Sequence, residues 1–208
     1  MAQTAPAPAT FELAAPRRRR IGILAVQGDV REHARAILEL GAEPVEVRLP
    51  RDLVGLDALI LPGGESTTMR MLIDRYGLRE PIVALAQGGA PVYGTCAGMI
   101  LLADRIADGD EPVLRLLDIT VQRNAYGRQL DSFEADIAIP SLGEAPMHGV
   151  FIRAPVVSEV GPAVEVLAHD PDGRPIAVRQ GRVLATAFHP KLTPDRRLHR
   201  LFLDLIES

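Results

Sequence analysis

A sharp strand-to-helix turn at Gly94-Thr95-Cys96-Ala97-Gly98 constrains the fold of this chain more than any other stretch. An apolar, strand-like run (Pro91 to Tyr93) precedes it, and a helix-like run (Ala97 to Ala103) follows it. Glycine is needed at both ends of the turn, because a Cβ there would clash. The turn holds Cys96 clear of the sheet at a helix N-terminus, where free N–H groups favour a thiolate. The alternative is a small buried hydrophobic residue, as most lone cysteines are.

Short apolar runs alternate with helical segments over the first half of the chain. Alternation of this kind predicts a parallel sheet covered by helices on both faces, which is an α/β fold. Asp29 and Ser66 are the expected N-caps of the first two helices. The expected strands are Ile21 to Val26, Val45 to Leu49 and Ala58 to Leu61, and the expected helices are Val30 to Leu40, Ser66 to Tyr76 and Arg79 to Gln87.

The second half of the chain is richer in strands. The segment between Ile119 and Val157 contains strand-like stretches but no clear long helix, so we expect antiparallel strands that extend the sheet or lie beside it. The turn Asp172-Gly173 predicts a hairpin between two later strands. The expected strands are Phe133 to Ile139, Gly149 to Arg153, Val164 to His169, Ile176 to Arg179 and Val183 to Ala187, and a closing amphipathic helix is expected over Leu198 to Ile206.

Length and composition suit a single domain. The chain has 208 residues, of which 47% are hydrophobic and 24% charged. We expect a disordered tail over residues 1–20, rich in alanine and proline and ending in four arginines, ahead of one domain over residues 21–208. The alternative for the arginines is a contact with an acidic partner.

The bulk numbers also exclude several classes of protein. The single cysteine excludes an internal disulfide, so we expect a cytoplasmic protein. No apolar run approaches the roughly 18 residues that span a membrane, and we expect no membrane partner. The net charge of −4 gives no reason to expect nucleic acid as a partner.

A thiolate nucleophile needs a base, which is usually a histidine close in space. His189 ends the apolar run from Val183 and precedes a proline. Because ligands gather at the carboxyl ends of parallel strands, Cys96 and His189 are expected to meet there. The other four histidines are expected in helical patterns, at the surface or in packing (His33, His199), or in turns (His148, His169).

Two further features could serve the same site. Pro62-Gly63-Gly64-Glu65-Ser66 lies at another strand end, where its free N–H groups could form an oxyanion hole with the Ala97 N–H as second donor. An ordinary turn is the alternative. Arg123 and Arg153 each lie in a polar break and could hold a carboxylate through two N–H groups, although most arginines simply lie at the surface.

These motifs resemble a known family. Gly94 to Gly98 together with Pro62 to Arg70 is similar to the class I (triad) glutamine amidotransferases. Three further stretches narrow the resemblance to the glutaminase subunit of pyridoxal 5′-phosphate synthase: Leu24 to Gly28, Arg123 to Gln129, and Gly149 to Pro155. The resemblance runs from about Ile21 to the C-terminus.

The resemblance implies a three-layer α/β/α sandwich with a mostly parallel sheet and an antiparallel extension. It implies hydrolysis of L-glutamine to glutamate and ammonia, with no cofactor and no metal. The ammonia would pass to a separate (β/α)₈ synthase subunit within a large hetero-oligomer, and that subunit would build pyridoxal phosphate from a pentose phosphate and a triose phosphate. Such glutaminases are typically idle until the synthase docks and completes the oxyanion hole.

The resemblance also implies a role for each matching residue. Cys96 would be the nucleophile and His189 the base. Gln27 would lie near the oxyanion hole and the synthase interface. The glutamine site would be lined by Gly64, Glu65, Ser66, Arg123, Ile152 and Arg153.

One position departs from the family pattern, which has His-Pro-Glu where this chain has His189-Pro190-Lys191. The glutamate would accept a hydrogen bond from the imidazole and fix its tautomer, which an ammonium cannot do. At about 4 Å and an effective dielectric constant of about 20, repulsion between ammonium and imidazolium is about 4 kcal/mol. A lysine that swings into solvent would relieve the repulsion without restoring the acceptor.

The sequence thus predicts a broken triad and a glutaminase of reduced activity. The alternative is a catalytically impaired subunit, natural or engineered, that binds the synthase and glutamine. A cysteine hydrolase of another class, such as a peptidase, suits the small polar site less well. Whether another acid replaces the glutamate stays open, and Asp195 is the one near in sequence.

Overall fold

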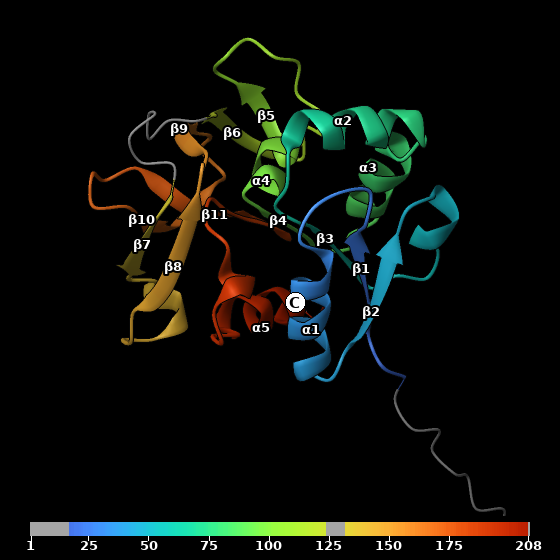
Figure 1. The fold of residues 1–208 in the computed structure, drawn as a ribbon, viewed down its shortest axis with the longest axis horizontal. Coiled ribbons are helices and arrows are strands. Elements are labelled where there is room, and N and C mark those ends of the chain that lie inside the picture. The colour runs from blue at the N-terminus through green and yellow to red at the C-terminus, as the bar shows by residue number, and fades with distance from the viewer. Residues whose placement is uncertain (1–16, 124–131, 208) are drawn as a thin grey trace, which may run out of the picture.

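A seven-stranded sheet forms the centre of the fold (Figure 1). The computed structural model describes residues 17–123 and 132–207. The strand order is β10-β11-β12-β4-β3-β1-β2; the five strands from β12 to β2 are parallel, and β10 and β11 add an antiparallel edge. The strands are β1 (Arg20–Leu24), β2 (Glu43–Val47), β3 (Ala58–Leu61), β4 (Val92–Thr95), β10 (Glu165–His169), β11 (Pro175–Gln180) and β12 (Val183–Thr186). The predicted α/β fold with a mostly parallel sheet and an antiparallel extension is confirmed.

The helices lie on the two sides of this sheet. Figure 1 shows α2, α3 and α4 above the central strands and α1 and α5 below them. Every residue of β3 and β4 is buried, which explains why these strands appear in the sequence as continuous apolar runs. The helices are α1 (Val30–Glu39), α2 (Ser66–Arg75), α3 (Arg79–Gln87), α4 (Ala97–Leu102) and α5 (Arg197–Asp204), with short 3₁₀ turns η1 (Pro50–Leu53), η2 (Pro140–Leu142) and η3 (Pro190–Leu192).

The middle of the chain forms two smaller sheets beside the central one. One contains β5 (Ala103–Ile106), β6 (Leu117–Gln122) and β9 (Val156–Val160), and the other is the antiparallel pair β7 (Ser132–Ile137) and β8 (Met147–Ile152). The helix predicted up to Ala103 ends at Leu102, because the chain turns there into β5, a strand that the sequence pattern did not predict. The β10–β11 pair is the hairpin predicted from Asp172-Gly173.

Of the two predicted N-caps, Asp29 is confirmed in position and Ser66 is wrong by one residue. Asp29 occupies the N-cap position of α1 but makes no capping hydrogen bond with its side chain. The N-cap of α2 is Glu65 rather than Ser66, because the longer carboxylate reaches two backbone N–H groups of the first turn. The side chain of Asp29 is therefore available for contacts outside its own helix.

At the N-terminus, Arg17 donates to the carboxylate of Asp57, and Arg20 begins β1. The part of the predicted tail before Arg17 lies outside the described residues. Within residues 17–123 and 132–207, no helix is both long enough and apolar enough to cross a membrane.

Candidate active site

The turn at Cys96 has the predicted geometry. Cys96 follows β4 directly, precedes α4, and has a φ of 51°, which a non-glycine residue adopts only under constraint. A Cβ at Gly94 would lie 2.5 Å from the carbonyl oxygen of Gly98, and a Cβ at Gly98 would lie 2.0 Å from the carbonyl oxygen of Leu61. The two glycines thus allow β4, α4 and β3 to pack closely enough to form the turn.

The thiol of Cys96 is shielded from solvent. The residue is 6% exposed, and its Sγ lies 3.8 Å from the carbonyl oxygen of Ile152. Burial raises the pKa of the thiol above its ordinary value, and the positive charge of Lys191 and the Ala97 N–H oppose this shift without cancelling it. The Ala97 N–H at the helix N-terminus thus favours the thiolate, as predicted, but burial outweighs it in the resting chain. A base must remove the proton.

His189 follows β12 at the same edge of the sheet. Its backbone N–H donates to the carbonyl oxygen of Val150 at 2.8 Å, and the preceding Phe188 packs against Phe151 of β8. The imidazole is buried, and burial lowers its pKa, with Asp29 opposing and Lys191 reinforcing the shift. The ring is therefore neutral near pH 7. Its Nε2 is buried with no hydrogen-bond partner among the described residues.

Lys191 points into the protein rather than into solvent. Its side chain is fully buried, and its Nζ lies 2.8 Å from Oδ2 of Asp29 and also contacts Nδ1 of His189. The same Oδ2 of Asp29 lies 3.4 Å from Nδ1 of His189. Burial lowers the pKa of Lys191, and Asp29 opposes that shift. The pKa of Asp29 falls to about 2, with the contact to His189 as the largest cause.

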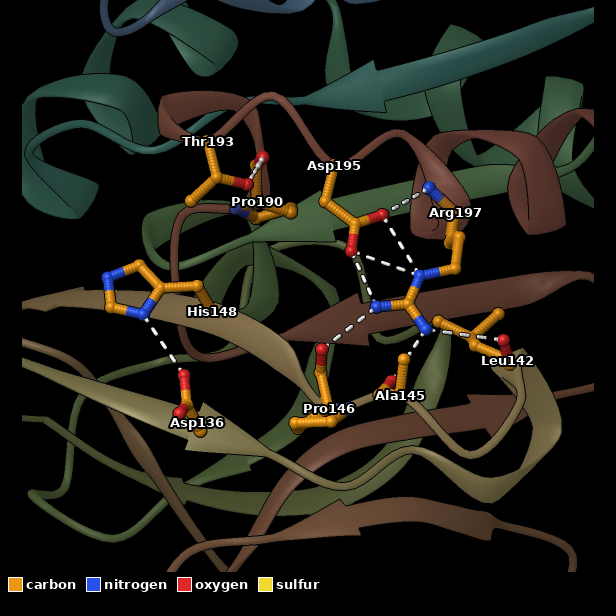
Figure 2. A network of polar contacts seen from close by, with 9 residues as sticks. All are labelled: Asp136, Leu142, Ala145, Pro146, His148, Pro190, Thr193, Asp195 and Arg197. Atoms are coloured by element: carbon orange, nitrogen blue, oxygen red, sulfur yellow. Dashed lines mark hydrogen bonds and ion pairs between the residues drawn. The ribbon is translucent and has the colours of Figure 1, made fainter.

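Asp195, the acid nearest to Lys191 in sequence, does not contact His189. Its carboxylate pairs with Arg197 at 2.6 Å, and the guanidinium of Arg197 donates to backbone carbonyls between β7 and β8, including Ala145 at 2.7 Å (Figure 2). This network joins the start of α5 to the smaller sheet. Asp195 therefore has a structural partner of its own.

Cys96 and His189 line one cavity of about 500 Å³. The cavity brings together every residue predicted for the site except Lys191, which lies behind His189. The predicted residues that line it are Gln27, Gly64, Glu65, Ser66, Cys96, Ala97, Arg123, Ile152, Arg153 and His189. Asp29, Thr67 and Ile100 also line it and were not predicted.

The loop between β3 and α2 is held by Gln27 and by its own carboxylate. Oε1 of Gln27 accepts a hydrogen bond from the Glu65 N–H at 2.8 Å, and a Cβ at Gly64 would lie 2.4 Å from that oxygen. Gln27 thus lies against Gly64, where the resemblance places it. The Glu65 carboxylate accepts from Thr68 and from the Thr67 N–H, which lowers its pKa to about 2.

The two predicted arginines differ in their surroundings. Arg123 lines the cavity, but its guanidinium pairs with Asp108 and Asp110. Arg153 lies just after β8 with a φ of 43°, and within the described residues no ion pair involves it. Arg153 is therefore the free cation of the cavity among those residues. The rest of the motif that begins at Arg123, residues 124–129, lies outside the described residues.

The remaining histidines lie away from the cavity. His33 of α1 and His199 of α5 are buried and packed together, with Nδ1 of His33 3.1 Å from Nε2 of His199, so the packing alternative is right for both. His148 lies within β8 rather than in a turn, since β7 pairs with that strand and supplies Glu134 and Asp136 as contacts of the imidazole. Figure 2 shows the contact with Asp136. His169 ends β10.

Comparison with known proteins agrees with this arrangement. The model of the SNO glutamine amidotransferase family matches residues 23–208. The pyridoxal 5′-phosphate synthase subunit PdxT of Frankia alni is 56% identical over 191 residues, which cover 91% of this chain and 96% of that protein. The protein of the same name from Geobacillus thermodenitrificans is 57% identical over 189 residues, with 91% and 96% coverage.

Solved structures share the fold. The crystal structure of a glutamine amidotransferase, 49% identical, has a TM-score of 0.84 and covers 90% of this chain and 99% of that chain. The structure of PurLQS from Thermotoga maritima, only 18% identical, has a TM-score of 0.65 with 91% and 99% coverage, which shows a shared fold alone. With its family model matched over nearly the whole length, this chain belongs to the SNO glutamine amidotransferase family.

Proposed function

We propose that this chain is the glutaminase subunit of a pyridoxal 5′-phosphate synthase. It hydrolyses L-glutamine to glutamate and ammonia. The observation that carries the proposal is the meeting of Cys96 and His189 in one cavity, at the carboxyl ends of β4 and β12. The cavity also contains the loop N–H groups and the cation that a small amino acid substrate requires.

The reaction begins with proton transfer from Cys96 to His189. The thiol is neutral because burial raises its pKa, and the imidazole is neutral because burial lowers its pKa. Nε2 of His189 takes the proton as Sγ attacks the side-chain carbonyl carbon of glutamine. The oxygen becomes negative in the tetrahedral intermediate and accepts hydrogen bonds from the N–H groups of Ala97 and Gly64.

The intermediate then collapses to a thioester. The C–N bond breaks, and the imidazolium of His189 donates its proton to the departing nitrogen, which leaves as ammonia. A water molecule next attacks the thioester carbonyl while His189 takes its proton. The C–S bond breaks, the proton returns to the sulfur of Cys96, and glutamate is released.

Substrate recognition falls to the polar walls of the cavity. The guanidinium of Arg153 is placed to hold the α-carboxylate of glutamine through two N–H groups. Arg123 is held by Asp108 and Asp110, so it would have to leave these acids before binding substrate. Glu65, Ser66 and Ile152 complete the wall around the amino acid.

The proposed partner is the (β/α)₈ synthase subunit, in a large hetero-oligomer in the cytoplasm. The relatives that support this partner bear the name of a synthase subunit. Gln27 holds the loop that carries Gly64, so docking near Gln27 would adjust the oxyanion hole. Without the synthase subunit, this chain therefore hydrolyses glutamine slowly.

The test is ammonia release from L-glutamine in the presence of the synthase subunit, with Cys96→Ala as the matched control. Release that depends on Cys96 supports the proposal. A second function, a subunit that binds glutamine and the synthase without turnover, is favoured by the contact of Lys191 with His189. Glutamine binding without ammonia above the control would establish that second function.

A further inference from the structure

We propose that Asp29 is the positioning residue of His189: its carboxylate accepts the Nδ1–H of the imidazole and restores the triad that Lys191 interrupts. Lys191, in turn, holds that carboxylate in place. The inference rests on the proposed glutaminase function. The sequence predicts a broken triad, whereas this inference gives a complete triad whose acid comes from the loop between β1 and α1.

The backbone around Asp29 directs its side chain away from α1. Gly28 has a φ of 110°, and a Cβ there would lie 2.0 Å from the carbonyl oxygen of Gly63. The Asp29 N–H donates to that same oxygen at 3.1 Å, while the Val30 N–H donates to the carbonyl of Gly28 at 2.9 Å. With φ −83° and ψ 57°, Asp29 is the central residue of an inverse γ-turn. The turn explains why the carboxylate does not cap the helix.

Gly63 lies directly against both members of the pair. A Cβ at Gly63 would lie 2.7 Å from Cε1 of His189 and 3.0 Å from Oδ2 of Asp29. Only a glycine therefore leaves room for the imidazole and the carboxylate beside this loop. The same loop carries Gly64, so the acid, the base and the proposed oxyanion hole are fixed by one segment.

The buried positive charge of Lys191 beside His189 requires the carboxylate of Asp29 as its partner. Lys191 is fully buried, and a buried ammonium is costly unless it is paired. Asp29 Oδ2 supplies the pair at 2.8 Å while lying 3.4 Å from Nδ1 of His189. A lysine acting alone would donate to Nδ1, and the ring proton would then be on Nε2, where it would block the base. Nζ of Lys191 also contacts Nδ1, so the ammonium and the carboxylate compete for this ring nitrogen. When the ammonium donates to the Asp29 carboxylate instead, Nδ1 can keep its proton and Nε2 its lone pair.

The position of Asp29 in the cavity wall makes this arrangement testable. Asp29 is 40% exposed in its side chain, whereas Lys191 is not exposed at all, so Asp29 can be changed with less effect on the core. The charged and titratable groups that act on His189, Lys191 or Cys96 come from four parts of the chain: Asp29, Glu32, Cys96, Arg153, His189 and Lys191.

The experiment compares glutamine hydrolysis in the presence of the synthase by the unmodified chain, Asp29→Asn, Lys191→Glu and the Asp29→Asn/Lys191→Glu double variant. Removing the acid of a serine protease triad costs about 10⁴ in kcat, and a more acidic thiol should lose less. We expect Asp29→Asn to lower kcat by about 10²–10³ with KM within about threefold. Lys191→Glu should change kcat less than about tenfold, because one of the two neighbouring carboxylates takes up a proton and the other still accepts the Nδ1–H. The double variant should recover at least about tenfold over Asp29→Asn, because a carboxylate returns beside the imidazole.

Asp29→Asn has two effects that must be distinguished: it removes the hydrogen-bond acceptor of His189, and it leaves the ammonium of Lys191 without its ion-pair partner. The Asp29→Asn/Lys191→Met variant removes both charges, so it should fold and stay as slow as Asp29→Asn. Full activity in this variant would overturn the inference, because the defect would then come from the unpaired lysine. Asp195→Asn is the matched control at an acid that pairs with Arg197 instead, and its kcat should not change.

The pH dependence of kcat/KM distinguishes a residue that positions His189 from one with a purely structural role. Asp29 raises the pKa of His189, so its removal should move the acidic limb of kcat/KM to lower pH. An unchanged limb with an unchanged kcat in Asp29→Asn would overturn the inference and leave the glutaminase proposal intact. If neither the unmodified chain nor Lys191→Glu released ammonia, the glutaminase proposal itself would fail.

Discussion

The ammonium of Lys191 and the carboxylate of Asp29 form a 2.8 Å ion pair directly behind His189. Lys191 is the only lysine among 23 lysine and arginine residues, and its side chain is completely buried. The pair keeps the imidazole of His189 away from an uncompensated positive charge. The acid that pairs with Lys191 comes from the loop between β1 and α1, far from Lys191 in the sequence.

Cys96 is expected to be the sole nucleophile. Cys96→Ala should abolish ammonia release while glutamine binding and the melting temperature change little, because the side chain is small and its turn is set by the backbone. A glutamine-analogue electrophile should modify Cys96, as located by mass spectrometry. Cys96→Ser is a matched control that keeps the size and loses the sulfur. Hydrolysis by the alanine variant would remove Cys96 from this role.

Dependence on the synthase is the second expectation. Oε1 of Gln27 accepts a hydrogen bond from the Glu65 N–H, next to the proposed oxyanion-hole donor Gly64. Docking of the synthase should adjust this loop and raise kcat, whereas the isolated chain should show little activity. Initial rates of ammonia release with and without the synthase test this point. Equal rates would mean that the chain completes its oxyanion hole by itself.

A methyl group at Gly63 should disturb the site without unfolding the protein. The new Cβ would overlap with the imidazole of His189 and approach Asp29, so one of them must move. We expect Gly63→Ala to lower kcat by at least about tenfold, since misplacement by about 1 Å can cost 10²-fold. Gly88→Ala is the control, because its Cβ would meet nothing closer than 3.2 Å. An unchanged kcat in Gly63→Ala would contradict the described packing.

The buried pair of His33 and His199 should make stability depend on pH. Burial lowers the pKa of His33 well below its ordinary value and that of His199 to about 3. The unfolded chain therefore binds more protons than the folded chain between about pH 3 and 6.5. The contribution of these histidines to the free energy of unfolding is complete above about pH 6.5 and is lost as the pH drops. Each such histidine contributes a slope of about 1.4 kcal/mol per pH unit within that window. His189 has the same sign, because burial lowers its pKa too.

His199→Gln should reduce that slope while keeping a hydrogen-bond donor for His33. Free energies of unfolding in urea between about pH 7 and 5 measure the change, a range above most carboxylate titration. His148→Gln is the control, because His148 should affect the pH dependence of stability with the opposite sign. Glu134 and Asp136 raise the pKa of His148, so its contribution is present at low pH and lost as the pH rises. An unchanged slope in His199→Gln would contradict this account, because the pKa of His199 would then be the same in the folded and the unfolded chain.

Much of the fold could be predicted because its signals are local. Ala58–Leu61 and Arg79–Gln87 have the predicted bounds, since an apolar run and a helical pattern with turn residues at their ends define them. Ala103–Ile106 and Val156–Val160 could not be assigned in this way. Each becomes a strand by pairing with Leu117–Gln122, a partner that the local sequence does not reveal.

The site could be predicted wherever a strand end carried a distinctive residue. Cys96 and His189 met because both follow parallel strands, and Gly64 follows a third. Asp29 follows β1 at the same edge, but its place before α1 was interpreted as a cap. Whether Lys191 swings into solvent could not be decided from the sequence, because burial of its side chain depends on tertiary contacts. Thr67 and Ile100 have no chemical signature and line the cavity only through the position of their helices.

The tautomer of His189 tests the central claim most directly. Nitrogen-15 NMR of the histidine-labelled chain near neutral pH can report which ring nitrogen carries the proton, and His189→Gln identifies the signal by its loss. If Asp29 accepts from the imidazole, the proton is on Nδ1 and Nε2 is free, and in Asp29→Asn the proton moves to Nε2. A proton on Nε2 in the unmodified chain would contradict the account, because Lys191 would then be the group that controls His189 and the base would be blocked.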